Sequence, residues 1–502
     1  MRDEDSIRGE LRSAAQAFIA EAIPVLHGLR LFPAPRSRPH IHIGEEYFGS
    51  EFRLVSQPPL EAAIQRAHPR FEHAGSNMPA DFAGPYAYAL IEACVARLAF
   101  TDDPWLLDQP AVEQTIEQFL TAVLSPERET ASCRVVSHFR TFDDQPMTVG
   151  DVTVVPVACE PADHRGTLRQ ILNSVIEGTG VVMHRSEASE MFAPPEAVLI
   201  ALARTSDEHE TGFDLRRKVG SVVHAARLLH AGTSQSMYEV SGETSFVRRS
   251  SPVLHVFDGH TGLMSWTQQV RRDVVLMPGD PARIAGIEDL IRSADRPRPD
   301  VSIQSFALAT GRFEGSFQAV NPYDQVVDLM TALEGAMGGA NANEVLLRLR
   351  TRCAALLAAA NDPAAAIFED IGTLYKLRST LVHGGEMKAK ELTKLLRKVS
   401  GAVDGVSFLE AFGYAVDRLR DLVRRSLLVR ICLGSGQDPV WPIDSDEGID
   451  SGLSDDATRV MWRTAWHDKL RSIDAEAAAL RPAVADSYLA TFGKNPPTSL
   501  PR

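Results

Sequence analysis

Apolar residues recur at helical spacing at both ends of this chain, and short β-branched runs replace them in between. Near the start, an apolar stripe covers residues 7–22, with Leu11 and Phe18 on the same helical face. The same spacing returns over residues 87–100, and prolines mark irregular connections between the two stretches. The pattern predicts a mainly helical N-terminal region over residues 1–128.

Residues 129–318 carry the pattern of an α+β region. Two β-branched runs, 133–142 and 149–157, flank the turn-forming sequence at 143–146 and predict a β-hairpin. Further strands are expected at 197–203, 253–257 and 301–309, and helices at 168–177 and 215–229. This region is a candidate sensor or substrate-selecting domain.

From Asn321 onwards the pattern becomes purely helical. Asn321-Pro322 combines an N-cap residue with proline at the first helical position. Amphipathic helices are expected at 321–338, 344–359, 363–384 and 408–432, and together they predict a four-helix bundle over 319–436. The last part, 437–502, is expected to form an acidic linker, one helix at 457–480 and a frayed tail. The predicted fold is therefore multidomain and α-rich, with the helical and α+β regions preceding the bundle.

Composition and charge narrow the function classes. The 502 residues are 44% hydrophobic and 24% charged, as in ordinary globular proteins, and the net charge of −14 disfavours nucleic acid as a partner of the whole surface. Five scattered cysteines without a C-x-x-C pair oppose a disulfide framework or a Cys-rich zinc site. The start lacks the apolar region of a signal peptide, and no apolar run approaches the ~18 residues of a membrane helix. We expect a soluble, cytoplasmic protein without a membrane partner.

Several common catalytic and cofactor motifs are missing from the sequence. It contains no P-loop, no G-x-S-x-G nucleophile elbow and no H-E-x-x-H zinc motif. His40 and His42 alternate around Ile41, but two histidines do not make a metal site, and a structural role is favoured for them. We therefore expect no metal and no cofactor.

The most informative segment, 374–385, ends the third predicted helix of the bundle with the sequence LYKLRSTLVHGG. It places Arg378 and His383 away from the apolar stripe, with Ser379 beside the arginine. The spacing alone carries no information, since Arg204 and His209 have the same spacing in a polar, loop-like stretch. At 100° per residue, positions 378 and 383 differ by about 140° around the helix. A bundle that dimerises along this helix would bring two such pairs into one composite cleft.

This segment resembles the HEPN fold (higher eukaryotes and prokaryotes nucleotide-binding), in particular its Apea-like branch. The resemblance rests on R-S-x-x-x-H-G at the helix end and on Ala332-Leu333-Glu334 in the first bundle helix. It also rests on a long Arg-rich fourth helix containing Asp417-Arg418-Leu419-Arg420 and Arg424-Arg425. It covers about a quarter of the chain, residues 320–436.

The resemblance implies a metal-independent endoribonuclease that leaves a 2′,3′-cyclic phosphate, acts as a homodimer and serves as a toxin or as an abortive-infection effector against phage. RNA, with tRNA as one candidate, would be the substrate. The implied catalytic residues suit this chemistry. His383 can move a proton near neutral pH, and Arg378 can stabilise the phosphorane-like transition state. Ser379 can orient the histidine or the phosphate. The N-terminal regions would receive an unknown trigger.

Basic residues surround this segment. Residues 341–430 carry 15 Lys and Arg against 10 Asp and Glu, a positive stretch in an acidic chain. Six of these residues are candidate clamps for an RNA backbone, namely Lys376, Lys388, Lys390, Lys394, Arg397 and Lys398. They would equally serve as a solvated face. Arg378 and His383 also have non-catalytic interpretations. Arg378 would form an ion pair with an acidic residue such as Glu334, and His383 would be favoured at the helix C-terminus by the helix dipole. The alternative function is a non-catalytic module that binds RNA, nucleotide or a partner protein.

Overall fold

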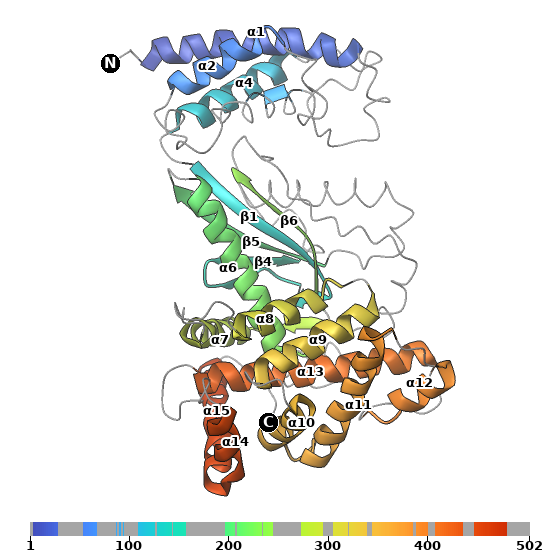
Figure 1. The fold of residues 1–502 in the computed structure, drawn as a ribbon. Helices are drawn as coiled ribbons and strands as arrows, with labels where there is room; N and C mark the ends of the chain where they lie inside the picture. Colours follow the sequence, from blue (N-terminus) through green and yellow to red (C-terminus); the bar gives the residue numbers. More distant parts are fainter. Residues whose placement is uncertain are drawn as a thin grey trace.

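The computed structural model in Figure 1 describes most of the chain. It covers residues 4–28, 54–67, 109–125, 128–156, 196–243, 273–294, 305–338, 344–399, 407–434 and 446–478, apart from short gaps within these ranges, together with positions 87, 90, 91 and 94. The expected helix at 168–177, the expected strand at 253–257 and the histidines at 40 and 42 lie outside the described residues. Among the described helices, none combines the length and the apolarity needed to cross a bilayer.

The N-terminal region is helical where it is described, as predicted. Its three labelled helices are α1 (Glu4–Gly28), α2 (Gln57–Ala67) and α4 (Gln109–Leu124), which pack against one another. Leu11 and Phe18 of α1 meet Leu60 of α2 and Phe119 of α4 in a hydrophobic core of their own. The helical position Cys94 is buried in the same core.

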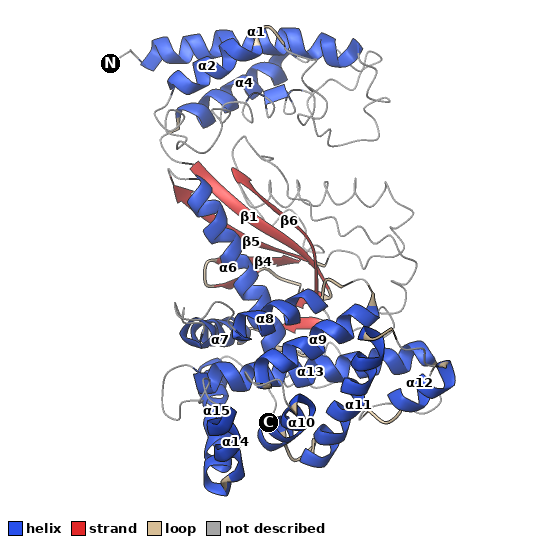
Figure 2. Cartoon of the chain, viewed as in Figure 1, coloured by secondary structure: helices blue, strands red, loops and turns tan. Residues whose placement is uncertain are grey.

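A five-stranded antiparallel sheet follows (Figure 2), in the order β3-β4-β5-β1-β6. Its strands are β1 (Arg128–Ser137), β3 (Met147–Val149), β4 (Val152–Pro156), β5 (Ala197–Thr205) and β6 (Gln235–Glu243). Helix α6 (Glu208–Leu229) packs on this sheet, mainly on β1 and β5. Two short strands, β2 (Phe139–Thr141) and β7 (Val274–Leu276), form a separate parallel pair.

The predicted hairpin is wrong in its pairing. The run at 133–142 pairs with β5, β6 and β7, whereas β4 pairs with β3 and β5. The true hairpin joins β3 to β4 through Gly150, whose φ of +56° is a conformation that favours glycine. The described residues of the predicted turn, 144–146, lie between β2 and β3.

The strand predicted at 301–309 is also wrong where the structure describes it, because α8 (Ser305–Ser316) is a helix. Phe306, Ala309 and Phe313 recur at helical spacing and are all buried. Before it lies α7 (Asp280–Ala294), which the sequence pattern did not predict.

The predicted helices of the bundle are present and pack together. They are α9 (Pro322–Met337), α10 (Val345–Leu357), α11 (Ala364–Val382) and α13 (Phe408–Gly434). Asn321 caps α9 as predicted, because its side-chain oxygen accepts a hydrogen bond from the Tyr323 amide at 2.9 Å. A short helix, α12 (Ala389–Leu396), packs on α13, and the C-terminal helix α15 (Asp456–Ala478) packs on α13 and α7. The expected acidic linker contains a further helix, α14 (Asp446–Ser454).

The sheet and the bundle share one hydrophobic core, which crosses the boundary expected at residue 319. Leu199 of β5, Val223 of α6, Phe313 of α8, Met330 of α9 and Leu419 of α13 all belong to it. Residues 129–318 and 319–436 therefore stabilise each other directly.

Helix α8 is joined to α6 by a buried ionic cluster. Glu314 pairs with Arg227 and His224. Burial alone would raise the pKa of Glu314, but its interactions with Arg227 and His224 outweigh burial and lower that pKa to about 2. Beside this cluster, the Phe313 ring packs edge-on against the Phe317 ring, with 5.1 Å between the ring centres. The centre of the His224 ring is 6.3 Å from that of Phe313.

If the sheet and the bundle form one cooperative unit, Phe313→Ala will lower the free energy of unfolding by about 3–5 kcal/mol, as expected for a fully buried aromatic residue. Chemical denaturation followed by circular dichroism should show the transition of both parts shifting together. Leu308→Ala on the exposed side of α8 is the control and should change stability by about 0.5 kcal/mol or less. A variant in which the bundle unfolds at its original midpoint would contradict the shared core.

Candidate functional site

The end of α11 positions the residues singled out by the sequence. Ile371, Leu374 and Leu377 bury one face of the helix in the core. His383 is the C-cap residue, and its backbone N–H donates to the Ser379 carbonyl at 3.1 Å. Gly384 follows with φ +63°, the left-handed conformation that commonly ends helices. These features leave the His383 side chain exposed at a fixed helix end.

Arg378 lies on the half-buried side of α11, next to α9. Its guanidinium is 3.8 Å from the Glu334 carboxylate and 5.9 Å from the centre of the Tyr375 ring. Its Nε is buried and has no hydrogen-bond partner among the described residues. Burial raises the pKa of Glu334, and the charge of Arg378 opposes that rise. The pairing with Glu334 considered from the sequence is therefore present as a long ion pair.

Within one chain, Arg378 and His383 do not converge. Five residues of α-helix separate them by about 7.5 Å along the axis and about 140° around it. No hydrogen bond between their side chains occurs in the described part of the chain. Ser379, which is half-buried, lies next to Arg378 and supplies the carbonyl that holds His383. The site is thus a set of three side chains on one helix end that needs a second surface to enclose a ligand.

The six basic residues considered as RNA clamps all lie on the surface. Lys376 is on the exposed face of α11, and the others lie on or beside α12, at positions 388, 390, 394, 397 and 398. None of the six forms an ion pair with another described residue. Helix α12 buries Leu396 and directs its charged residues outwards. This surface therefore remains available for an anionic ligand or for solvent.

The arginines of α13 have a different environment. Arg418 binds Asp362 at 2.8 Å and Asp370 at 2.9 Å, and Arg425 also binds Asp362. Arg424 donates to a backbone carbonyl of α6 at 2.9 Å and pairs with a neighbouring aspartate. These guanidinium groups serve packing, so the positive charge counted over 341–430 overstates what an anionic ligand would meet.

Sequence reasoning missed Tyr375 as a neighbour of Arg378. Their spacing could have indicated this contact, because residues three positions apart are neighbours on the same face of a helix. Comparisons of the chain with protein-family models, with curated proteins and with solved structures found no match. The function is therefore argued from the geometry above and from the resemblance of the helix-end segment.

Asp362→Asn tests the structural role of the α13 arginines. Burial raises the pKa of Asp362, but the hydrogen bonds and charges of Arg418 and Arg425 outweigh it, so the pKa is lowered in the folded protein. The substitution removes one of the two carboxylates that each of these largely buried guanidinium groups contacts, since Arg418 keeps Asp370 and Arg425 keeps Asp421. It should lower the free energy of unfolding by about 1.5–3 kcal/mol at pH 7, the usual effect of losing a hydrogen bond to a charged group.

The pH dependence gives a second readout for this variant. A carboxylate with a depressed pKa stabilises the fold above its unfolded pKa of about 3.9 and loses that contribution as pH falls through the folded value. The stability gap between the wild type and Asp362→Asn should therefore narrow below about pH 4. Asp289→Asn, which breaks an exposed pair with Arg292, should change stability by about 0.5 kcal/mol or less. Equal effects of the two substitutions would contradict the structural role.

Proposed function

We propose that this protein is a metal-independent endoribonuclease of HEPN type, whose catalytic residues are Arg378, His383 and Ser379. One observation supports the proposal above the others. Two of the three segments on which the resemblance rests, 332–334 on α9 and 374–384 at the end of α11, lie side by side through the Glu334–Arg378 pair. Two short motifs that were matched separately in the sequence thus meet where α9 and α11 pack together.

The chemistry follows from the residue types. The ribose 2′-oxygen would attack the adjacent phosphorus while the 5′-oxygen leaves, giving a 2′,3′-cyclic phosphate and a free 5′-hydroxyl. A histidine takes the proton of the 2′-hydroxyl, and a histidine returns a proton to the leaving 5′-oxygen. Arg378 would hold the phosphate oxygens while negative charge builds on them. Ser379 would orient the phosphate or the imidazole.

A homodimer would complete the site. Because one chain keeps Arg378 and His383 apart, an arginine and a histidine meet at one phosphate only if two helix ends face each other. Val382, beside His383, is 48% exposed, so an apolar contact for a second copy lies at the same helix end. The six basic residues around α12 would extend the cleft along the RNA backbone. The role as a toxin or anti-phage effector, the choice of tRNA and a trigger acting on the N-terminal regions rest on the resemblance alone.

The second candidate is a non-catalytic module that binds RNA, nucleotide or a partner protein through the same bundle. The Glu334–Arg378 pair favours this candidate. Arg378 is half-buried and already has a carboxylate neighbour, so it is less available to bind a phosphate. In that case the basic surface would bind its partner and Arg378 would hold α11 on α9.

Cleavage assays in EDTA separate the two candidates. Purified protein would be incubated with tRNA and total RNA, and the ends of the products would be analysed. For the ribonuclease, His383→Ala should slow cleavage by about 10²–10⁴-fold, the usual contribution of a catalytic acid or base. Arg378→Ala should slow it by about 10²–10³-fold, the usual effect of losing one group that stabilises transition-state charge. RNA binding and thermal unfolding should change far less than the cleavage rate. Ser379→Ala should have a smaller effect.

Arg471→Ala, an exposed arginine on α15, is the matched control and should cleave as the wild type does. Products with 2′,3′-cyclic phosphate ends in EDTA would support the proposed mechanism. Binding of RNA without cleavage by the wild type would favour the module. Cleavage that persists in both Arg378→Ala and His383→Ala would rule out the proposed catalytic residues.

A further inference from the structure

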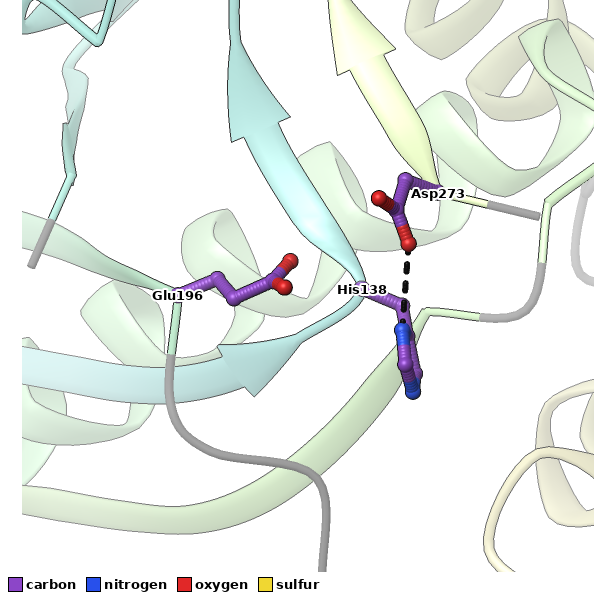
Figure 3. A group of neighbouring side chains, drawn as sticks. All are labelled: His138, Glu196 and Asp273. Atoms are coloured by element: carbon purple, nitrogen blue, oxygen red, sulfur yellow. Dashed lines mark hydrogen bonds and ion pairs between the residues drawn. The ribbon is translucent and has the colours of Figure 1, made fainter. Parts of the chain in front are cut away.

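A second group of polar side chains lies far along the chain from α11, where strands of the two sheets meet. His138 lies between β1 and β2, Glu196 immediately precedes β5, and Asp273 immediately precedes β7. One possible ligand atom from each side chain lies within 4.8 Å of the others. Figure 3 shows the Glu196 and Asp273 carboxylates reaching towards His138 from different strands. Among the described residues, no other group of three comes together in this way.

The backbone around these residues is fixed by strand hydrogen bonds. The His138 carbonyl accepts from the Val274 amide at 2.9 Å, and the Glu196 amide donates to the Val136 carbonyl at 3.0 Å. One Glu196 oxygen also accepts from the Phe139 amide at 3.2 Å. The three side chains are therefore presented by rigid strand ends, which gives a ligand site its precision.

The side chains themselves are close and partly enclosed. His138 Nδ1 lies 3.1 Å from an Asp273 oxygen, and the His138 side chain is only 9% exposed. The donor atoms of one first-row metal ion each lie at about 2.0–2.2 Å from it, so they are at most about 4.4 Å apart. Neighbouring donors around a tetrahedral ion are closer, about 3.4 Å apart, so side-chain rotations that close gaps of up to about 1.4 Å would bring all three donors onto one ion.

Charge explains why an ion would enter. Two carboxylates and one imidazole carry a negative excess, and Arg140, whose charge opposes the rise in the pKa of Glu196, is already paired with Asp144 at 3.3 Å. A divalent cation would cancel that excess. An imidazole nitrogen with two carboxylate oxygens suits Mn²⁺, Fe²⁺ or Zn²⁺ better than Mg²⁺ or Ca²⁺, which prefer oxygen alone.

We propose that His138, Glu196 and Asp273 bind a divalent transition-metal ion of the Mn²⁺ or Zn²⁺ type. The ion would join the β1–β2 junction to the starts of β5 and β7. Three protein ligands leave coordination positions open for water or for a ligand, as in metal sites that do chemistry. This site is formed by other elements than the end of α11, so it stands independently of the proposed ribonuclease function. The sequence analysis expected no metal.

Metal titration of the full-length, untagged protein tests the site. After removal of bound ions with a chelator, Mn²⁺ binding would be followed by electron paramagnetic resonance and Zn²⁺ binding by calorimetry. Mn²⁺ is informative because it prefers carboxylate oxygen to thiolate ligands, so the buried cysteines should not compete for it. We expect one ion per chain. His138→Ala and Asp273→Asn should each weaken binding at least about 10-fold. Even the mutation of a residue that only hydrogen-bonds to a metal ligand usually has an effect of that size.

Glu196→Gln provides a variant that keeps the acceptor for the Phe139 amide while removing the charge, and it should also weaken binding. Thermal unfolding in EDTA identifies any variant that fails to fold. The controls are His383→Ala and Asp289→Asn, an exposed histidine and an exposed aspartate elsewhere, and both should bind the ion as the wild type does. A wild-type protein that binds no stoichiometric Mn²⁺ or Zn²⁺ would overturn the proposal. Binding that is unchanged in every folded ligand variant would overturn it as well.

Discussion

The arginines of α13 hold this structure together. The last carbonyls of an α-helix have no partner within the helix and carry partial negative charge, so a buried helix end needs a donor. Arg424, Arg425 and Arg430 supply that donor to the last turns of α6, α10 and α9. A guanidinium suits the task because it presents several donors in a fixed plane while its stem packs in the core. One helix thereby fixes the ends of three others, across the boundary between sheet and bundle.

This arrangement changes how the charge of the bundle is understood. An arginine-rich helix suggests a nucleic-acid surface, but these side chains are directed into the protein and bind carbonyls and carboxylates. The basic residues on and beside α12 are the ones that face outwards, and they follow the exposed His383 in the chain. The candidate site therefore combines a rigid interior with a basic surface at the end of α11. The proposed metal site lies on other elements, so metal binding and cleavage in EDTA are separate questions.

The sequence pattern correctly predicted the features that depend on residues close together in the chain. The amphipathic stripes of α9, α10, α11 and α13 and the cap at Asn321 were found from the sequence, because each depends on neighbours within one or two turns. The pairing of Arg378 with an acidic neighbour such as Glu334 was one of the alternatives left open by the sequence. The strand partner of β1 was not predictable, because β5 and β6 are distant in sequence. The short apolar run in α8 fits a strand or a helix equally well until its packing partners are known.

The proposed metal ligands could not be grouped from the sequence either, because they are far apart in the chain. His138, Glu196 and Asp273 are dozens of residues apart, and nothing about their individual contexts suggests a common function. They meet only because β1 ends where β2, β5 and β7 begin. The positive φ of His138, +54°, is the one unusual local feature, and it becomes visible only in the structure.

The most direct test of the central claim, that an arginine and a histidine from two chains act on one phosphate, is to mix two inactive variants. Arg378→Ala and His383→Ala proteins would be co-refolded or co-expressed, and cleavage would be compared with each variant alone. A mixed dimer has a cleft with one intact Arg378 and one intact His383, so the account predicts that part of the wild-type rate returns. A mixture no more active than its components, under conditions where the wild type cleaves and mixed dimers are demonstrated, would contradict it.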